Sequence, residues 1–184
     1  MIQYHPVTPE RLGDLARFSE AHGKFRYCSC MRWRLTSAQY RQSTKESRVQ
    51  ALDDLVRQST PIGVLAYEGD TPIGWCSIAP RETYGALERY KGLPRLDDKP
   101  VWSVVCFFVD RRVRRTGLTV GLLGAAVDYA RACGATIIEG YPGLYSFMGT
   151  SAAFEKAGFA DVTPSGQQRR VMRWRSAHGA QTHP

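Results

Sequence analysis

One stretch of this sequence, residues 101–134, constrains the possible folds more than any other. It opens with a nearly unbroken apolar run, Val101 to Val109, which predicts a buried strand. A basic turn, Asp110 to Thr119, reads DRRVRRTGLT, and apolar residues at helical spacing follow it as far as Gly134. Because the first N–H groups of a helix have no intrahelical partners, a helix that starts at such a turn points several of them at one place. The turn is therefore predicted to bind phosphate.

Two common phosphate-binding loops do not match this turn. A P-loop requires GxxxxGK followed by Ser or Thr, and a dinucleotide-binding turn requires GxGxxG, whereas residues 114–119 read RRTGLT with a single glycine. The segment instead resembles the acyl-CoA loop of the GCN5-related N-acetyltransferases, the GNAT family, in which a strand precedes R/Q-x-x-G-x-G/A. Arg114 and Gly117 stand at its first two fixed positions, and Thr119 replaces the last small residue.

Two further segments strengthen the resemblance. Thr136 to Tyr141 reads as the family's next strand, and Phe154 to Phe159, FEKAGF, is similar to its closing helix and Gly-Phe turn. Together with the loop they cover residues 60–175 in the family's order. The resemblance implies one α/β domain over residues 1–176, a mixed sheet with antiparallel N-terminal strands, a splayed central parallel pair and flanking helices. Residues 177–184 form a polar tail that we expect to be frayed.

The remaining pattern predicts elements in the same order. Ile62–Tyr67 and Ile73–Ile78 are β-rich runs joined by a turn sequence, EGDTP, and predict an antiparallel hairpin. The order strand, helix, strand over residues 101–141 requires a parallel pair joined by a right-handed crossover. The other expected elements are a strand at Ile2–Pro6, helices from Thr8 to about His22, from a capping box at Ser43–Glu46 to about Ser59 and from Thr150 or Ser151 to Ala157, a long polar loop at Pro80–Pro100 and a last strand at Val171–Trp174.

The resemblance implies that the cofactor is acetyl-CoA. In the family the central strand separates from its parallel neighbour, so that its last residues, here Phe108 and Val109, pair with the pantetheine amides. Backbone N–H groups of the turn, with the guanidinium groups of Arg114 and Arg115, would receive the pyrophosphate. The expected cofactor-binding residues are Phe108, Val109, Arg114, Arg115, Thr116, Gly117, Leu118, Thr119 and Val120.

A general base is expected, because an acceptor ammonium must lose a proton before its nitrogen can attack. Glu139 is the best carboxylate by position, since it stands near the end of the second parallel strand, where ligands of such sheets gather. Two other roles are equally open for Glu139: a substrate anchor, or a partner in an ion pair with an arginine. Glu82, in the long polar loop, is a second choice of base.

The general acid of the family is missing. Many members have a tyrosine directly before E-K-x-G-F, and here that residue is Phe154. Tyr145 is the expected substitute because it stands in the irregular connection after the second parallel strand, ahead of Ser151 and Tyr141. A thiolate is also a tolerable leaving group, so catalysis without a dedicated acid is the alternative.

No motif identifies the acceptor. In the family the region after the first helix lines the acceptor cleft, and the aromatic candidates for substrate contact are Tyr27, Trp33, Tyr84 and Tyr141. Packing against the sheet is an equal alternative for Trp33. The net charge of +8 would repel a long basic peptide, so we expect a small-molecule amine. Acetylation of a protein or peptide amine, and an acyl-CoA sensor without turnover, are the alternatives.

The charge distribution and the composition also bear on the partners and the location of the protein. The arginines cluster directly before Thr116, which suits a compact polyphosphate better than a nucleic-acid track, so nucleic acid is not an expected partner. No apolar run reaches the ~18 residues of a membrane span, and the N-terminus has no secretory pattern, so a cytoplasmic location is expected. Five cysteines, an odd number, predict no structural disulfide, and Cys28-Ser29-Cys30 alone is too weak a motif to predict a metal. A homodimer is left open.

Overall fold

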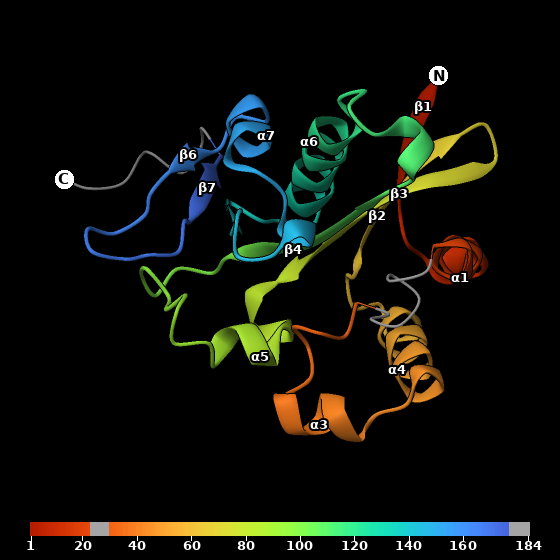
Figure 1. Cartoon of the computed structure of the whole chain (residues 1–184), viewed down its shortest axis with the longest axis horizontal. Coiled ribbons are helices and arrows are strands. Elements are labelled where there is room, and N and C mark those ends of the chain that lie inside the picture. Colours follow the sequence, from red (N-terminus) through yellow and green to blue (C-terminus); the bar gives the residue numbers. More distant parts are fainter. Residues whose placement is uncertain (23–29, 177–184) are drawn as a thin grey trace.

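The computed structural model describes residues 1–22 and 30–176, and within them seven strands form one mixed sheet in the order β1-β2-β3-β4-β5-β7-β6 (Figure 1). The strands are β1 (Ile2–Pro6), β2 (Gly63–Glu68), β3 (Thr71–Pro80), β4 (Trp102–Val109), β5 (Ile137–Gly140), β6 (Ala160–Asp161) and β7 (Met172–Arg175). The α-helices are α1 (Leu12–Ala21), α3 (Ser37–Gln42), α4 (Lys45–Arg57), α5 (Gly85–Glu88), α6 (Leu118–Ala132) and α7 (Ser151–Lys156). The expected α/β class is confirmed, and none of the helices in this part of the chain could cross a membrane.

Helices cover both faces of the sheet. α6 and α7 lie on one face, whereas α1, α4 and α5 lie on the other (Figure 1). Alternating residues of β2 pack into two hydrophobic cores, one on each face of the sheet, because successive side chains of a strand point to opposite faces. Val64 and Ala66 belong to the core that includes α6, and Leu65 and Tyr67 belong to the core that includes α1 and α4. Burial on both faces explains why this strand reads as a continuous apolar run.

The N-terminal half of the sheet is antiparallel, as predicted. β1 pairs with β2, β2 with β3 and β3 with β4, all antiparallel, and the turn between β2 and β3 contains Gly69 at a positive φ of 57°. β3 extends past the predicted end at Ile78 because Pro80 still lies opposite Trp102 in β4. This half of the sheet supports one side of β4 along its whole length.

The other side of β4 separates from its parallel neighbour. β5 pairs with β4 only from Trp102 to Val104, so the β5-facing peptide groups of the second half of β4 have no strand beside them. The separation starts where β4 carries an irregularity: Ser77 lies opposite Cys106 and Ile78 opposite Val104, which leaves Val105 as an extra residue. An extra residue of this kind bends a strand and increases its twist. The splayed parallel pair expected from the family resemblance is therefore confirmed.

Two predicted helix starts are corrected, and one helix was not predicted. A 3₁₀ turn at Pro9–Arg11 precedes α1, so the α-helix starts later than Thr8. The capping box before α4 is shifted by one residue, because Thr44 caps the helix and exchanges hydrogen bonds with Ser47. Helix α3 was not predicted; it has its own capping box between Thr36 and Gln39.

The long polar loop after β3 is folded around one buried arginine. Arg81 is 1% exposed, its Nε donates to Glu88 Oε1 at 2.6 Å, and its Nη2 donates to the carbonyl oxygen of Leu93 at 2.6 Å. Further along the loop, Asp97 accepts a hydrogen bond of 2.6 Å from Arg173 of β7. The two contacts of Arg81 hold the loop together, and the contact of Asp97 attaches it to β7.

The contact between Asp97 and Arg173 predicts a loop that loosens in acid. The hydrogen bond from Arg173 holds the pKa of Asp97 below its usual range. A carboxyl group with a lowered pKa stabilises the folded state above its unfolded pKa of about 3.9, and this contribution is lost as the pH falls through the folded pKa. We therefore expect the Asp97→Asn variant to show a smaller drop in melting temperature than the parent between about pH 6 and about pH 3.

Asp98→Asn is the matched control for that comparison. Asp98 is the next residue, is exposed, and forms no ion pair with the residues that the structure describes. Its replacement should leave the pH dependence of the melting temperature as in the parent. Equal drops in the parent and in Asp97→Asn would show that this ion pair contributes nothing to acid stability.

Candidate active site

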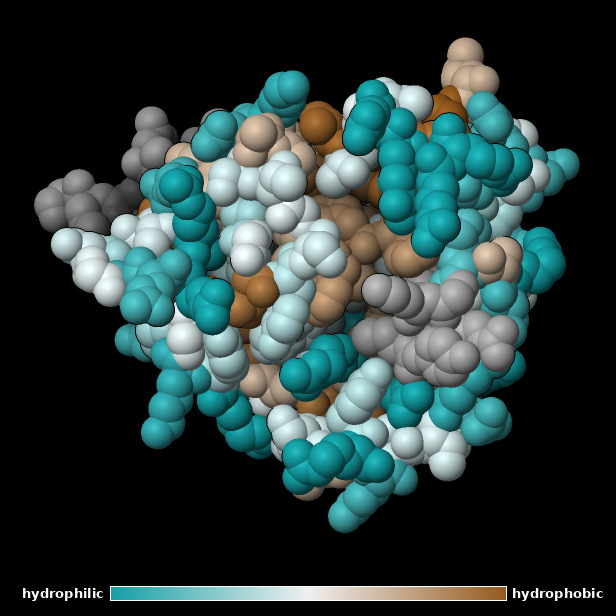
Figure 2. Space-filling model, in the orientation of Figure 1, coloured by the Kyte–Doolittle hydropathy of each residue, from teal (hydrophilic) through white to brown (hydrophobic). Residues whose placement is uncertain are grey.

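A cleft of about 1160 Å³ runs along the free edge of β4. Its walls come from the second half of β4, the turn that leads into α6, and the segment from Tyr145 to Ala153. His22, Arg32 and Tyr40 line it from the helical layer that includes α1 and α3. Figure 2 shows apolar surface in a hollow near the centre of this face, in the region where Figure 1 places β4.

The turn before α6 adopts a conformation that exposes backbone donors. Arg115 and Gly117 both have positive φ angles, 66° and 88°, and no side chain caps the helix. The N–H groups of Val120 and Gly121 bond to the carbonyl oxygen of Gly117, so the helical ladder begins only with them. The preceding N–H groups stay available for a ligand anion. A Cβ at residue 117 would meet nothing within 4 Å, so glycine is required there by its φ angle and not by crowding.

Side chains hold this turn in place. Asp110 accepts hydrogen bonds from the backbone N–H and the guanidinium of Arg112, and these bonds hold the pKa of Asp110 well below its usual range. Thr116 donates its hydroxyl to the carbonyl oxygen of Val113 at 2.7 Å, and Arg114 Nε donates to the carbonyl oxygen of Val109 at 3.3 Å. The turn is thus ordered by contacts within itself.

Most of the residues predicted to bind the cofactor lie together in the cleft. Two of the predicted set do not line it: Val120, which is in the first turn of α6, and Thr116, whose hydroxyl is used inside the turn. The predicted residues that line the cleft are Phe108, Val109, Arg114, Arg115, Gly117, Leu118 and Thr119.

Comparison with known proteins agrees with this arrangement. The sequence matches the Acetyltransferase (GNAT) family over residues 28–159. The chain belongs to the GNAT family. No protein with a curated description matches it in sequence.

Solved GNAT structures have the same fold. PaiA N-acetyltransferase from Thermoplasma acidophilum, solved in complex with coenzyme A, is 16% identical, covers 96% of this chain and 99% of its own, and has a TM-score of 0.53. The aminoglycoside acetyltransferase AAC(6')-Ib, in complex with ribostamycin and coenzyme A, is 19% identical over 100% of this chain and 98% of its own, with a TM-score of 0.58. YncA of Salmonella typhimurium, a putative acetyltransferase solved with acetyl-CoA, is 14% identical over 95% and 93%, with a TM-score of 0.53. At such identities the likeness shows the fold alone.

Phe154, at the tyrosine position of the GNAT pattern, is a core residue in this chain. Its side chain is fully buried, with edge-on contacts to Phe107 and Phe159 at ring distances of 6.0 and 5.1 Å. It also lies against β5, because a Cβ at Gly140 would come within 2.0 Å of its ring. Gly140 therefore makes room for Phe154, and this position packs the sheet against α7.

Glu139 forms ion pairs with two arginines. Its Oε1 accepts hydrogen bonds from Arg173 Nε at 2.9 Å and Nη2 at 2.5 Å, and its Oε2 lies 3.4 Å from Arg81 Nη1. The carboxylate is 2% exposed and is not among the groups that line the cleft. Of the roles considered for Glu139, pairing with arginine is the one that this geometry favours, because both carboxylate oxygens are in contact with guanidinium groups and neither reaches the cleft.

Tyr141 completes the same cluster. Its hydroxyl donates to Glu139 Oε2 at 3.0 Å and accepts a hydrogen bond from Arg81 at 2.8 Å. Because its one proton goes to Glu139, the 2.8 Å contact with Ser103 is best described as donation by Ser103. Burial, together with the neighbouring Glu139 carboxylate, raises the pKa of Tyr141. Tyr141 was expected to contact substrate, but the structure places it inside the protein, away from the cleft lining.

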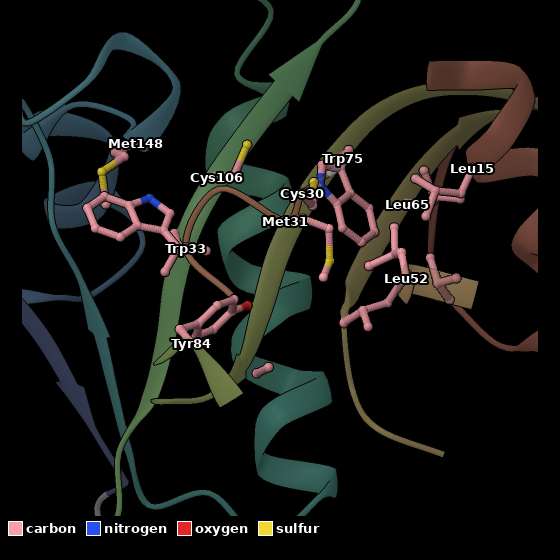
Figure 3. Packing of buried hydrophobic residues seen from close by; sticks show 14 of the residues in the cluster. Leu15, Cys30, Met31, Trp33, Leu52, Leu65, Trp75, Tyr84, Cys106 and Met148 are labelled. Carbon is pink, nitrogen blue, oxygen red and sulfur yellow. Dashed lines mark hydrogen bonds between the residues drawn. The ribbon is translucent and has the colours of Figure 1, made fainter. Parts of the chain in front are cut away.

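The other aromatic candidates are buried or lie outside the described residues. Tyr84 is fully buried, with its hydroxyl 3.1 Å from Ser77 and its ring under the guanidinium of Arg34. Trp33 is 5% exposed and packs in the same apolar cluster as Tyr84 and Met148 (Figure 3). The structure thus favours the packing alternative for Trp33. Tyr27 lies outside the described residues.

Tyr145, the predicted proton donor, does line the cleft. It is 39% exposed, stacks on Phe147 at a ring distance of 5.1 Å, and has the ring of Trp33 6.1 Å away. Arg32, Tyr40 and Phe147 also line the cleft and were missed as site residues. They stand on short or irregular segments, where no periodic pattern marks them in the sequence.

The thiols of the described residues are free and mostly buried. Cys30, Cys76 and Cys106 are buried and Cys133 is exposed. Burial raises the pKa of Cys30 and of Cys76, so neither is a ready nucleophile. No three His, Cys, Asp or Glu side chains within residues 1–22 and 30–176 lie close enough together to hold a metal ion. Two of the three residues in the Cys28-Ser29-Cys30 motif are outside these ranges.

Proposed function

We propose that this protein transfers the acetyl group of acetyl-CoA to a primary amine of a small molecule, in a direct attack with both reactants bound. The observation that carries the proposal is the separation of β4 from β5 beyond Val104, along a cleft that reaches the start of α6. Unpaired peptide groups on an extended edge can pair with the amides of pantetheine as a further strand would. The donors at the start of α6 can then receive the pyrophosphate.

The residues of the cleft fit this cofactor. The N–H groups of Leu118 and Thr119 at the helix start, with the exposed guanidinium groups of Arg114 and Arg115, make a site for a compact polyanion. The structural neighbours solved with coenzyme A or acetyl-CoA share the fold and support the same choice. When bound, acetyl-CoA supplies an acetyl group activated as a thioester.

We propose that the acceptor loses its proton to water. Within the described residues the only carboxylate that lines the cleft is Asp110, whose oxygens are taken by Arg112. The imidazole of His22 is also occupied, since its Nδ1 donates to the carbonyl oxygen of Phe18 at 2.7 Å and its Nε2 lies 3.4 Å from Asp110. With no free carboxylate or imidazole among the described residues that line the cleft, the site works mainly by holding the reactants in position.

The proton that the leaving thiolate takes up is assigned to Tyr145 in this proposal. We expect Tyr145→Phe to lower kcat by about 100-fold, the lower end of the usual effect of general acid–base catalysis, because a thiolate leaves tolerably without help. The KM for acetyl-CoA should change little, since phenylalanine keeps the stacking on Phe147. Steady-state assays of thiol release measure both quantities.

Tyr90→Phe is the matched control for Tyr145→Phe. The ring of Tyr90 also lies beside Trp33, at 5.8 Å, but Tyr90 does not line the cleft. It should keep the kcat of the parent. A Tyr145→Phe enzyme with the same kcat as the parent would show that the thiolate leaves without a side-chain acid.

An amine screen tests the proposed activity itself. The protein is incubated with acetyl-CoA and a panel of small amines, peptides and no acceptor, while thiol release is followed and products are identified by mass. Acetylated small amines are the expected result. Tight binding of acetyl-CoA with no release of thiol would favour the sensor, and preferential acetylation of peptides would favour a protein substrate.

Location and assembly belong to the same proposal. We place the protein in the cytoplasm, where the free thiols of the described cysteines would stay reduced. A homodimer stays a prediction that sedimentation of the purified protein can test.

A further inference from the structure

The end of the cleft opposite α6 is lined by an arginine and by aromatic rings. Arg32 and Tyr40 line it, and Tyr40 comes from α3, which lies on the other side of the sheet from α6 (Figure 1). The stacked pair of Tyr145 and Phe147 forms another part of the lining. This end therefore combines one guanidinium group with flat aromatic surface.

Arg32 has no counter-ion among the residues that the structure describes. Its guanidinium lies 5.8 Å from the centre of the Tyr40 ring, and no carboxylate within residues 1–22 and 30–176 pairs with it. Arg34, two residues away, differs in this respect because its guanidinium is buried and bonds to Thr83 and the carbonyl oxygen of Pro61. Arg34 thus holds the structure together, whereas Arg32 is left with its charge facing the cleft.

The sequence around Arg32 contains nothing to balance that charge. Between Glu20 and Glu46 the chain has no Asp or Glu. The same stretch contains six basic residues: Lys24, Arg26, Arg32, Arg34, Arg41 and Lys45. A site for a polycationic acceptor needs carboxylates to receive the additional ammonium groups, and this segment offers none.

We infer that the acceptor amine also carries a carboxylate, which pairs with Arg32, as in a small amino acid with an apolar or aromatic side chain. The inference rests on the proposed function and names the substrate class of the same site. A guanidinium group presents its N–H donors as a planar fork that matches the two oxygens of a carboxylate. The aromatic lining formed by Tyr145 and Phe147 suits the apolar part of such a molecule. Arg32 is on this view a specificity-determining residue.

Matched acceptors test the inference. Phenylalanine is compared with 2-phenylethylamine, which lacks only the carboxylate, and both are compared with the polycations kanamycin and spermine. We expect kcat/KM to be higher for phenylalanine than for 2-phenylethylamine, by about 10- to 100-fold as for a hydrogen bond to a charged group. Arg32→Gln should remove most of this preference by raising the KM for phenylalanine, with no change for 2-phenylethylamine.

Two controls accompany the Arg32→Gln variant. The first tests whether the preference depends on Arg32 and not on any positive charge nearby. The second tests whether Arg32 contacts the acceptor and not the cofactor. Arg41→Gln removes a charge from the same segment at an exposed residue that does not line the cleft, and it should keep the preference. Binding of coenzyme A and of dephospho-coenzyme A to Arg32→Gln shows whether Arg32 instead contacts the cofactor phosphate. Loss of affinity for coenzyme A alone would reassign Arg32 to the cofactor and overturn the inference.

The experiment distinguishes failure of the carboxylate inference from failure of the proposed function. Equal use of phenylalanine and 2-phenylethylamine, or preference for kanamycin or spermine, would refute the carboxylate and leave the acetyltransferase activity intact. Absence of thiol release with every amine would refute the proposed function, and the inference with it. A carboxylate preference that disappears in Arg32→Gln and persists in Arg41→Gln supports both.

Discussion

Gly117→Asp should weaken the binding of acetyl-CoA by at least about 100-fold, since each hydrogen bond lost to a charged group costs ~1.5–3 kcal/mol. The substitution places a carboxylate beside the free N–H groups at the start of α6, where the pyrophosphate is expected. It also forces a side chain into a backbone conformation with φ at 88°, which costs ~1–3 kcal/mol at a non-glycine residue. Calorimetric titration with acetyl-CoA measures the loss.

Two variants separate the causes of that loss. Gly117→Ala has the same backbone strain without the charge, so it should bind acetyl-CoA more tightly than Gly117→Asp. Gly124→Asp adds a carboxylate to α6 at another open glycine that does not line the cleft, and it should bind acetyl-CoA like the parent. Unchanged affinity in Gly117→Asp would place the cofactor elsewhere and would falsify the proposed site.

Glu139→Gln should destabilise the protein by about 3 kcal/mol, the lower end of the range for breaking a buried ion pair. Arg81 and Arg173 are 1% and 2% exposed and both face this carboxylate, but they keep Glu88 and Asp97 as partners, so neither charge is left without an ion pair. Chemical denaturation measures the free energy of unfolding. The matched control is Glu155→Gln, an exposed glutamate of α7, which should unfold like the parent.

The Glu139→Gln variant also distinguishes a structural role of Glu139 from a role as general base. If Glu139 is structural, the folded fraction of Glu139→Gln should retain a turnover close to that of the parent at temperatures below its melting transition. A double variant with Arg173→Met should be less destabilised than the sum of the two single changes, because residues 139 and 173 are in direct contact and both single changes remove the same hydrogen bonds. A stable Glu139→Gln protein with turnover lowered by about 100-fold or more would instead restore the general-base role.

The turn that we propose binds the cofactor could be found in the sequence because its residues are neighbours in the chain. The strand, the basic turn and the helix follow one another within residues 101–134, so their order alone places Arg114 and Gly117 at the start of α6. The hairpin of β2 and β3 was predictable for the same reason, since a turn sequence joins two adjacent apolar runs. In each case the interacting residues are near neighbours in the chain.

The roles of Glu139 and Tyr141 could not be predicted in this way. Glu139 belongs to β5 and Tyr141 directly follows it, but their partners Arg81 and Arg173 come from a loop 58 residues before Glu139 and a strand 34 residues after it. Nothing in the pattern of β5 indicates that these side chains are enclosed together. Glu139 was therefore expected as the base, and Tyr141 as a substrate contact, from their place in the chain, and the structure places both in the protein interior.

The sequence by itself indicated the family, the order of the main strands and helices and the basic turn before α6, because periodicity and turn chemistry act over a few neighbouring residues. Only the tertiary structure decided where the sheet opens, since that depends on the extra residue Val105 in β4 and on pairing with β5 that stops at Gly140. It likewise decided which polar residues face the cleft and which are buried. Burial and ion pairing depend on partners distant in the chain, and those partners meet only when the sheet and its helices have packed together.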